Sequence, residues 1–296
     1  MRVFLTGATG FIGSAIIPQL IEAGHQVLGL TRSEAGAQSL VAAGAEPHRG
    51  ELEDLDSLRR GAAMSDAVIH CAFIHDFSKF QENSEIDRRA IEALGSALAG
   101  SDRPLLVSGG IGPWGSGGRP VTEDDDHPCD WPVPRVSEPC AMALIDQGVK
   151  AAVVRLPQVH DTARQGLVTP LIAIAREKGV SAYVGDGQNR WPAAHVLDVA
   201  RLYRLAIEQC VAGAKYHAVG EEGVTIQDIA QAIGRGLDVP AVSIPAEEAM
   251  AHLGFFGAFA SMDLAASSAL TQQRLGWRPS GPGMISDLDH MDYAAG

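Results

Sequence analysis

The amino-acid sequence predicts an α/β fold in which a doubly wound parallel sheet is joined to a smaller C-terminal domain. Apolar runs of strand length alternate with helical segments up to about residue 160, which is typical of a parallel sheet with helices on both faces. After that point the pattern is less regular, and segments such as 224–237 have the spacing of amphipathic helices. This change of pattern predicts a second, smaller unit.

The first thirty residues predict a strand, a glycine-rich turn, a helix and a second strand, in that order. Residues 1–5 are mostly apolar, and residues 6–13 read TGATGFIG. Residues 14–24 place apolar side chains at helical spacing and end at a glycine, as a helix C-terminus often does. Residues 25–30, HQVLGL, form the next predicted strand.

The three glycines of the turn have separable roles in binding a nucleotide. Gly7 permits a tight turn, Gly10 lets the backbone approach a pyrophosphate, and Gly13 lets the helix pack closely on the strand. The N-terminus of the following helix offers free N–H groups and a positive dipole end to phosphates. The motif therefore predicts a Rossmann-type dinucleotide site, and the alternative is a turn with a structural role alone.

The residues after the second strand indicate which dinucleotide binds. An acidic residue there would hydrogen-bond the ribose 2′-hydroxyl of NAD. The chain instead has Thr31, Arg32 and Ser33, and a guanidinium suits a 2′-phosphate. We expect NADP, with NADPH preferred over NADH; the alternative is that Arg32 is a solvated surface side chain.

The motif TGATGFIG resembles the extended branch of the short-chain dehydrogenase/reductase superfamily, which contains NAD-dependent epimerases, dehydratases and 3β-hydroxysteroid dehydrogenases. Residues 194–200, AHVLDVA, and 275–280, LGWRPS, are similar to later motifs of that branch, so the resemblance covers nearly the whole chain. It implies a cofactor domain of residues 1–165 and 194–218. Residues 166–193 and 219–296 would form the substrate domain.

The resemblance also implies which residues contact the cofactor, at the carboxyl ends of successive strands. They are Gly7, Thr9, Gly10, Phe11, Ile12, Gly13, Thr31, Arg32, Ser33, Glu51, Leu52, Cys71, Ala72, Phe73, Ser108, Pro157 and Val159.

The catalytic residues typical of the superfamily are absent. Its members use a serine after the fifth strand and a Tyr-x-x-x-Lys motif that delivers a proton, and none of the four tyrosines here has a lysine four residues later. Alignment to the superfamily places Pro134 at the tyrosine, Glu138 at the lysine, Gly110 at the serine and Asp87 at the helix asparagine. The chemistry must therefore differ from that of the family, or be missing.

Three interpretations remain open. The protein is a reductase with another proton donor, a redox-inactive NADP(H)-binding sensor or regulatory protein, or a protein whose cofactor site is vestigial. Candidate donors are Ser108, His75 and His160, with His195 and Tyr183 as further possibilities; Ser108 is equally a cofactor contact. An apolar wall of Phe255, Phe256, Phe259 and Trp191 would favour a small hydrophobic carbonyl or alcohol as substrate.

The composition indicates which binding partners and which cellular location to expect. The net charge of −13 disfavours nucleic acid and anionic membranes, and no apolar run reaches the ~18 residues of a membrane span. No leader precedes the first strand, so we expect a cytoplasmic protein. Four dispersed cysteines, without Cys-x-x-Cys spacing, predict neither disulfides nor a metal site.

A homodimer is a further possibility that the resemblance suggests. Family dimers pair two long helices, here about 82–98 and 137–147. Ile86, Ala90, Ile91, Leu94 and Leu98 recur at helical spacing, which fits a core face as well as an interface.

Overall fold

A seven-stranded parallel sheet forms the centre of the computed structural model, which describes residues 1–115, 118–128 and 133–295. The strand order is β10-β6-β5-β4-β1-β2-β3, and every neighbouring pair is parallel. The bounds are β1 Arg2–Thr6, β2 Gln26–Thr31, β3 Glu46–Arg49, β4 Ala67–His70, β5 Pro104–Gly110, β6 Lys150–Leu156 and β10 Lys215–His217. The predicted doubly wound sheet is confirmed.

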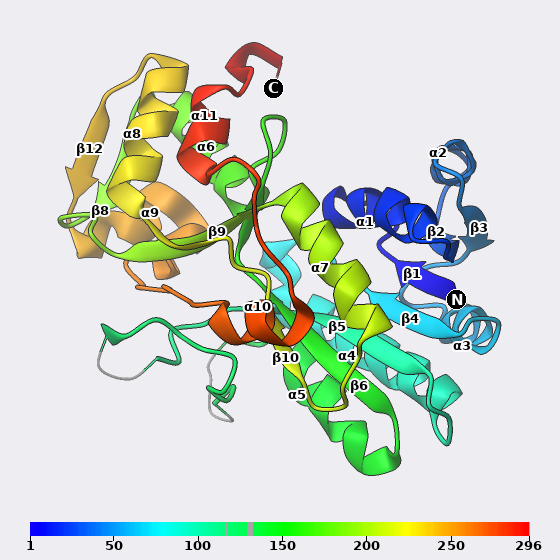
Figure 1. Ribbon diagram of the computed structural model, residues 1–296. Helices are drawn as coiled ribbons and strands as arrows, with labels where there is room; N and C mark the ends of the chain where they lie inside the picture. Colours follow the sequence, from blue (N-terminus) through cyan, green and yellow to red (C-terminus); the bar gives the residue numbers. More distant parts are fainter. Residues whose placement is uncertain (116–117, 129–132, 296) are drawn as a thin grey trace.

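Helices cover both faces of this sheet (Figure 1). Helices α1 (Phe11–Glu22) and α7 (Val196–Glu208) lie on one face, while α3 (Leu55–Ala63), α4 (Phe80–Leu98) and α5 (Ser137–Ala143) lie on the other. Helix α2 (Glu34–Ala42) packs beside β2 and β3. Parallel strands have to be covered on both sides because their βαβ crossovers put helices on both faces.

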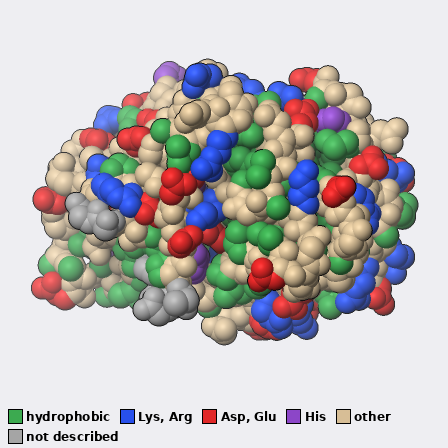
Figure 2. Space-filling view, turned by 60° about the horizontal axis from the view of Figure 1, so that its bottom comes forward, with side chains coloured by type: hydrophobic (Ala, Val, Ile, Leu, Met, Phe, Trp, Pro, Cys, Tyr) green, Lys and Arg blue, Asp and Glu red, His purple; other side chains and the backbone are tan. Residues whose placement is uncertain are grey.

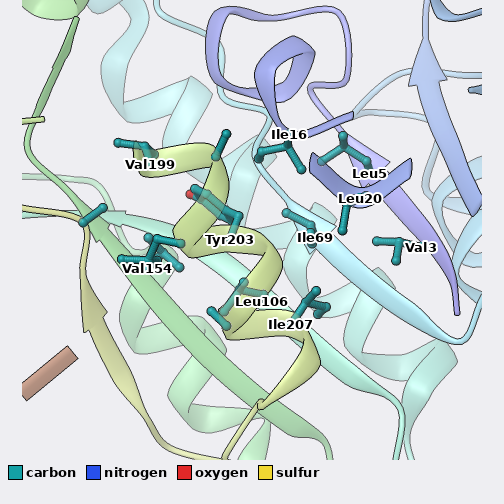
Figure 3. Packing of buried hydrophobic residues seen from close by; sticks show 14 of the residues in the cluster. Val3, Leu5, Ile16, Leu20, Ile69, Leu106, Val154, Val199, Tyr203 and Ile207 are labelled. Atoms are coloured by element: carbon teal, nitrogen blue, oxygen red, sulfur yellow. The ribbon is translucent and has the colours of Figure 1, made fainter. Parts of the chain in front are cut away.

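Two apolar cores form, because successive residues of a strand point to opposite faces. Val3 and Leu5 of β1 pack under α1 and α7, where Figure 3 shows Tyr203 lying between α7 and the strands. Phe4, between them in sequence, packs in the other core with Leu58. The sheet is thereby anchored on both sides, and its carboxyl edge is held as a platform for the site.

A second unit is built mainly from the C-terminal part of the chain. Strands β8 (Ser181–Val184) and β12 (Ala241–Ile244) pair in parallel and pack with α6 (Thr169–Lys178), α8 (Ile226–Leu237) and α9 (Ala249–Leu253). Helix α11 (Met284–Asp289) packs on α8. This unit has its own core, which includes Trp191, Ile229 and Met284.

A three-stranded sheet joins the two units. It has the order β11-β9-β7, with β7 at Gln158–His160, β9 at Arg190–His195 and β11 at Glu221–Thr225. After α10 (Ala269–Leu275) the chain returns to the first unit, where Trp277 is buried and its Nε1 donates to the Asp198 carbonyl at 3.0 Å. The segment LGWRPS thus closes the fold.

The apolar stripe of α4 belongs to the core of a single chain. Ile86, Ala90, Ile91, Leu94 and Leu98 are all buried against the sheet or its neighbouring helices. Exposed side chains of α4 instead form ion pairs, with Arg88 bound to both Glu85 and Glu92. The helical spacing is therefore explained without a second copy of the chain.

Charges of both signs are mixed on the surface. Figure 2 shows acidic and basic side chains interspersed over one face, with apolar side chains between them. Among the described residues, no helix combines the length and apolar character needed to cross a bilayer.

Candidate cofactor and substrate site

The glycine-rich turn is packed so closely that larger residues would not fit. Gly7 has φ of +69°, and a Cβ there would lie 2.8 Å from the Ala72 nitrogen. A Cβ on Gly13 would lie 2.1 Å from the Gly7 carbonyl oxygen. The turn therefore presses against the start of α1 and against the end of β4, which leaves its outer side to a ligand.

The N-terminus of α1 is free to bind an anion. Its N-cap residue is Gly10, no side chain caps it, and its first turn holds no acidic residue. Thr9 is exposed, and Phe11 and Ile12 are half-buried. The unpaired N–H groups at this end fit the pyrophosphate of a dinucleotide. The guanidinium of Arg164 lies 5.9 Å from the Phe11 ring centroid, a nearby cation that sequence reasoning missed.

The predicted adenosine contacts gather at the ends of β2 and β3. The Gly50 nitrogen donates to the Thr31 carbonyl at 3.1 Å, which brings Glu51 and Leu52 next to the end of β2. Thr31 is buried. Arg32 is exposed and forms no ion pair or hydrogen bond with the described residues. Ser33 caps α2 by accepting from the Gly36 nitrogen at 3.0 Å.

The end of β4 is tied to the turn through Thr6. The backbone nitrogens of Cys71 and Ala72 donate to Thr6 Oγ1 at 3.2 and 3.3 Å. Cys71, Ala72 and Phe73 are half-buried, which leaves part of each accessible. Burial raises the pKa of the Cys71 thiol, so it is not a reactive thiolate.

Ser108 is engaged inside the fold. Its hydroxyl donates to the His70 carbonyl at 2.8 Å and lies 2.6 Å from the Tyr203 hydroxyl, so Tyr203 is the donor in that second bond. The residue is only 4% exposed, and its side chain faces α7. Its one hydroxyl hydrogen is therefore not available to a substrate, which corrects the expectation of a proton donor here.

A half-open cleft of about 540 Å³, part of it open solvent, lies at the carboxyl end of β5. Most of its lining side chains are apolar, and the polar ones come from a loop and from the start of α5. The lining comprises Gly109, Gly110, Ile111, Gly112, Pro113, Trp114, His127, Val133, Arg135, Ser137, Glu138, Phe259, Met262 and Leu264. It is the place where the family would carry its serine and tyrosine.

Arg135 is the basic side chain of this cleft lining, one residue after the aligned tyrosine position. Its Nε donates to Ser137 Oγ at 3.0 Å, and its Nη2 donates to the Ser108 carbonyl at 3.2 Å. Its guanidinium carbon lies 4.3 Å from the Phe73 ring centroid. A cation thus stands between the predicted cofactor contact Phe73 and the cleft. Sequence reasoning missed it, although its place beside Pro134 was a signal.

Behind Arg135 a buried chain of hydrogen bonds leads back to the glycine-rich turn. Ser137 Oγ donates to Asp87 Oδ2 at 2.6 Å, and His70 Nε2 lies 3.0 Å from Asp87 Oδ1. His70 Nδ1 lies 2.8 Å from Thr6 Oγ1. Because that oxygen accepts two backbone N–H groups, its own hydrogen points to Nδ1. His70 therefore carries its proton on Nε2, facing Asp87.

Asp87 is the charged centre of this chain. Burial would raise the pKa of Asp87, but the hydrogen bond from His70 and the nearby charge of Arg135 outweigh it and hold the pKa below its usual value. The carboxylate is thus ionised while 1% exposed. The alignment places Asp87 at the family's helix asparagine. Its hydrogen bonds with His70 and Ser137 could not be predicted from the sequence.

Glu138, at the aligned lysine position, forms a buried ion pair with β6. Arg155 donates from Nε and Nη2 to its two carboxylate oxygens, at 2.8 and 2.6 Å. Arg155 Nη1 lies 3.2 Å from His217 Nε2, and its guanidinium carbon lies 4.7 Å from the Trp114 ring. The family's cation is replaced by a neutralised pair that holds the loop over the cleft.

The other candidate donors lie outside the cleft lining. His160 is fully buried, with Nδ1 2.7 Å from Asp287 Oδ2. Burial lowers the pKa of His160 despite that carboxylate. His195 caps α7 by accepting from the Leu197 nitrogen at 3.3 Å, and Tyr183 accepts a 3.5 Å bond from Gln227. On this geometry none of these three is placed to protonate a substrate there.

His75 belongs to an aromatic cluster that bridges the two units. Its ring meets Phe73 and Phe77 edge-on, and Phe77 stacks on Phe255 with ring centroids 4.7 Å apart. Phe256 also contacts Phe77. Of the predicted apolar wall, Phe259 lines the cleft, while Phe255 and Phe256 form this cluster.

The remaining predicted site residues are half-buried or lie in a core. Pro157 is half-buried, whereas the side chain of Val159 lies in the core beneath α7, so only its backbone could reach a cofactor. Trp191 is likewise in a core, that of the second unit. Among the described residues no group of three His, Cys, Asp or Glu side chains is placed to hold a metal. Cys71, Cys140 and Cys210 are free thiols, and Cys129 lies outside the described residues.

The sheet and the glycine cradle define a dinucleotide-binding α/β protein. Residues 3–98 match the NAD dependent epimerase/dehydratase family. The chain is 49% identical to the uncharacterized protein C2A9.02 of Schizosaccharomyces pombe over 290 residues, 97% of this chain and 98% of that one. It is 30% identical to the sterol-4-alpha-carboxylate 3-dehydrogenase, decarboxylating, of Dictyostelium discoideum, over 70% of this chain and 68% of that protein.

A solved structure agrees in fold. The UDP-glucose 4-epimerase of Thermotoga maritima superposes with a TM-score of 0.75 and 19% identity, covering 99% of this chain and 97% of that one. The chain belongs to the NAD-dependent epimerase/dehydratase family, an oxidoreductase-type branch of the extended short-chain dehydrogenases/reductases that binds NAD(P).

Proposed function

We propose that the protein is an NADP(H)-dependent oxidoreductase acting on a small hydrophobic carbonyl or alcohol. The observation that carries this proposal is the largely apolar cleft beside Arg135 and Phe73, at the sheet edge that also bears the glycine-rich turn. A bound nicotinamide would supply or accept the hydride. Gly7, Gly10, Gly13 and the start of α1 would hold its pyrophosphate.

The preference for NADP rests on the end of β2. Arg32 is exposed and has no partner among the described residues, so its donors are available to a 2′-phosphate. Ser33 keeps its hydroxyl hydrogen, since its oxygen only accepts in the cap of α2. No acidic side chain follows this strand directly to bind a ribose 2′-hydroxyl.

An apolar substrate is favoured by two lines of support. Ile111, Trp114, Phe259, Met262 and Leu264 line the cleft, and a lining of this kind binds apolar ligands. The relative from Dictyostelium carries the name of a dehydrogenase that acts on a sterol carboxylate, which has a large apolar body.

The experiment is an NADPH oxidation assay with a panel of apolar ketones, aldehydes and quinones, following the absorbance of the reduced nicotinamide. We expect at least one uncharged or singly charged apolar carbonyl to be reduced. NADPH binding without consumption by any compound would favour the sensor. A failure to bind NADPH or NADH would favour the vestigial site.

The sensor stays a second candidate because of one specific observation. The hydroxyl of Ser108 is engaged within the fold, and no tyrosine lines the cleft among the described residues. Proton delivery would then depend on water. Hydride transfer can still proceed under those conditions, because positioning itself supplies a large share of the rate.

Two further expectations belong with this proposal. We place the protein in the cytoplasm, which fractionation of cells expressing the tagged chain would test. We also propose a homodimer, in which the apolar stripe of α4 would take no part because it is already buried within one chain. Sedimentation that shows only a monomer at micromolar concentration would end it.

A further inference from the structure

We propose that Arg135 is an anion-binding residue and that the cleft takes an apolar molecule through a carboxylate. This inference deepens the proposed function by naming the substrate class, and it rests on that function only in placing the cofactor alongside. It is carried by three features of the structure, namely the lack of a direct carboxylate partner for Arg135 among the described residues, its fixed orientation and the apolar surroundings.

The charge of Arg135 has no direct counter-ion among the described residues. Its hydrogen-bond acceptors there are a hydroxyl, on Ser137, and a carbonyl, on Ser108, and both are neutral. The neighbouring Arg155 shows the contrast, because Glu138 occupies two of its nitrogens through both carboxylate oxygens. A half-buried guanidinium without a carboxylate partner favours an anionic ligand, since charge-assisted bonds are the stronger ones.

The guanidinium is held in a single orientation. One face lies on the Phe73 ring, Nε is bound to Ser137, and Nη2 is bound to Ser108. None of these contacts uses Nη1, which has no acceptor among the described residues. Five N–H donors in a planar fork leave a free pair that can meet a carboxylate.

The support behind Arg135 is rigid. Ser137 accepts from Arg135 while donating to Asp87, and Asp87 is fixed in turn by His70. All three of these supporting residues are buried. Ser137 and Asp87 are therefore positioning residues for Arg135, and the cost of orienting the cation has been met before a ligand arrives.

The surroundings select a singly charged apolar ligand over a phosphate. Arg135 is the only Lys or Arg among the described lining residues, and Glu138 beside it is already paired with Arg155. A phosphate carries more charge and is usually met by several cations or by a helix N-terminus. Phe259, Met262 and Leu264 line the same cleft and offer apolar surface to the body of such a ligand.

The test is calorimetric titration of phenylacetate and of phenylacetamide into the protein, with and without saturating NADP⁺. The two compounds have nearly the same shape and differ in charge. We expect phenylacetate to bind about tenfold more tightly or better, the usual advantage of a charged hydrogen bond. Arg135→Gln should remove that preference, and Arg135→Lys should keep part of it.

Arg60→Gln is the matched control, since it removes one positive charge from an exposed site on α3 outside the cleft. It should leave the preference for phenylacetate unchanged. Ser137→Ala should weaken phenylacetate binding less than Arg135→Gln, because the cation remains but is no longer held at Nε. Circular dichroism and thermal melting establish that each variant is folded.

The proposal is overturned if neither compound binds, if both bind equally well to the natural chain, or if Arg135→Gln keeps the preference. Failure of the proposed function looks different. In that case no carbonyl compound would be reduced, with or without binding of NADP⁺, whereas the titration without cofactor would still report the preference of Arg135 for the carboxylate.

Discussion

Glu138 and Arg155 face each other across the interior with two hydrogen bonds, at 2.6 and 2.8 Å, where the family would carry a catalytic lysine. Arg155 is fully buried and the side chain of Glu138 is 6% exposed. The pair also organises the loop above the cleft, because Arg155 Nη2 donates to the Asp125 carbonyl at 2.8 Å. The aligned lysine position therefore has a structural role in this chain.

Removal of one partner of this pair should be costly. Glu138→Ala leaves the buried Arg155 charge without its carboxylate, and we expect the free energy of unfolding to fall by about 3–5 kcal/mol. Urea denaturation measures the change. The control is Glu85→Ala, in an exposed pair with Arg88 on α4, for which less than about 1 kcal/mol is expected. Equal losses for the two variants would contradict this account.

The Gly7 turn should tolerate no side chain. Gly7→Ala adds a Cβ 2.8 Å from the Ala72 nitrogen at a φ of +69°, so strain and collision act together. We expect a loss of more than about 2 kcal/mol and no measurable NADPH binding by fluorescence titration.

Gly24 provides the comparison for Gly7. Its φ is +81°, but a Cβ there meets nothing within 4 Å. Gly24→Ala therefore isolates the backbone strain, for which about 1 kcal/mol is expected, and NADPH binding should be retained. If the two variants bound NADPH alike, the close packing of the turn on β4 would not matter for the cofactor.

Arg32 should discriminate between the two cofactors. Arg32→Ala removes the guanidinium proposed to meet the 2′-phosphate, so NADPH affinity should fall by about tenfold or more. NADH affinity should stay nearly constant, because that cofactor lacks the phosphate. Arg164→Ala, at the Phe11 end of the site, should instead weaken both cofactors. Equal effects of Arg32→Ala on NADPH and NADH would refute the assignment.

His217 should make stability depend on pH. Burial, together with the neighbouring charge of Arg155, lowers the pKa of His217 to about 3. The unfolded chain, with an ordinary pKa of about 6.5, takes up a proton that the folded chain refuses. The free energy of unfolding should therefore fall as pH drops from about 6.5 toward about 3, by about 1.4 kcal/mol per pH unit for this group.

The comparison for His217 is His217→Gln, which cannot titrate. Urea denaturation at a series of pH values should give a shallower fall for the variant than for the natural chain. The pKa of His160 is also lowered. His160 is present in both proteins, so its effect on stability cancels when the two curves are compared. Parallel curves would show that His217 does not resist protonation in the folded state.

The order of elements around the glycine-rich turn could be predicted because its determinants are local. Gly7, Gly10 and Gly13 lie within one strand, turn and helix, and each glycine answers a backbone requirement that neighbouring residues impose. The absence of the Tyr-x-x-x-Lys motif was equally visible in the sequence. Single contacts were harder to predict: His195, a candidate proton donor from the sequence, instead caps α7.

Asp198 shows why such contacts escape sequence reasoning. Its Oδ2 accepts from the backbone nitrogens of Ser280 and Gly281, which arrive from more than eighty residues away and hold the LGWRPS segment in place. A local sequence pattern cannot indicate a hydrogen-bond partner that is distant in the sequence and comes close only in the folded chain. The same separation explains the missed chain behind Arg135, since Ser137 and Asp87 are fifty residues apart.

Length, periodicity and glycine placement were thus enough to indicate the α/β class, the parallel sheet and the place of the dinucleotide, because backbone geometry and apolar spacing are properties of short segments. Only the tertiary structure decided which polar groups face the cleft. Ser108 turned toward Tyr203, Glu138 paired with Arg155, and Arg135 was held against Phe73. These contacts follow from hydrogen bonding in the buried interior, where most polar groups are paired with residues that only folding brings together.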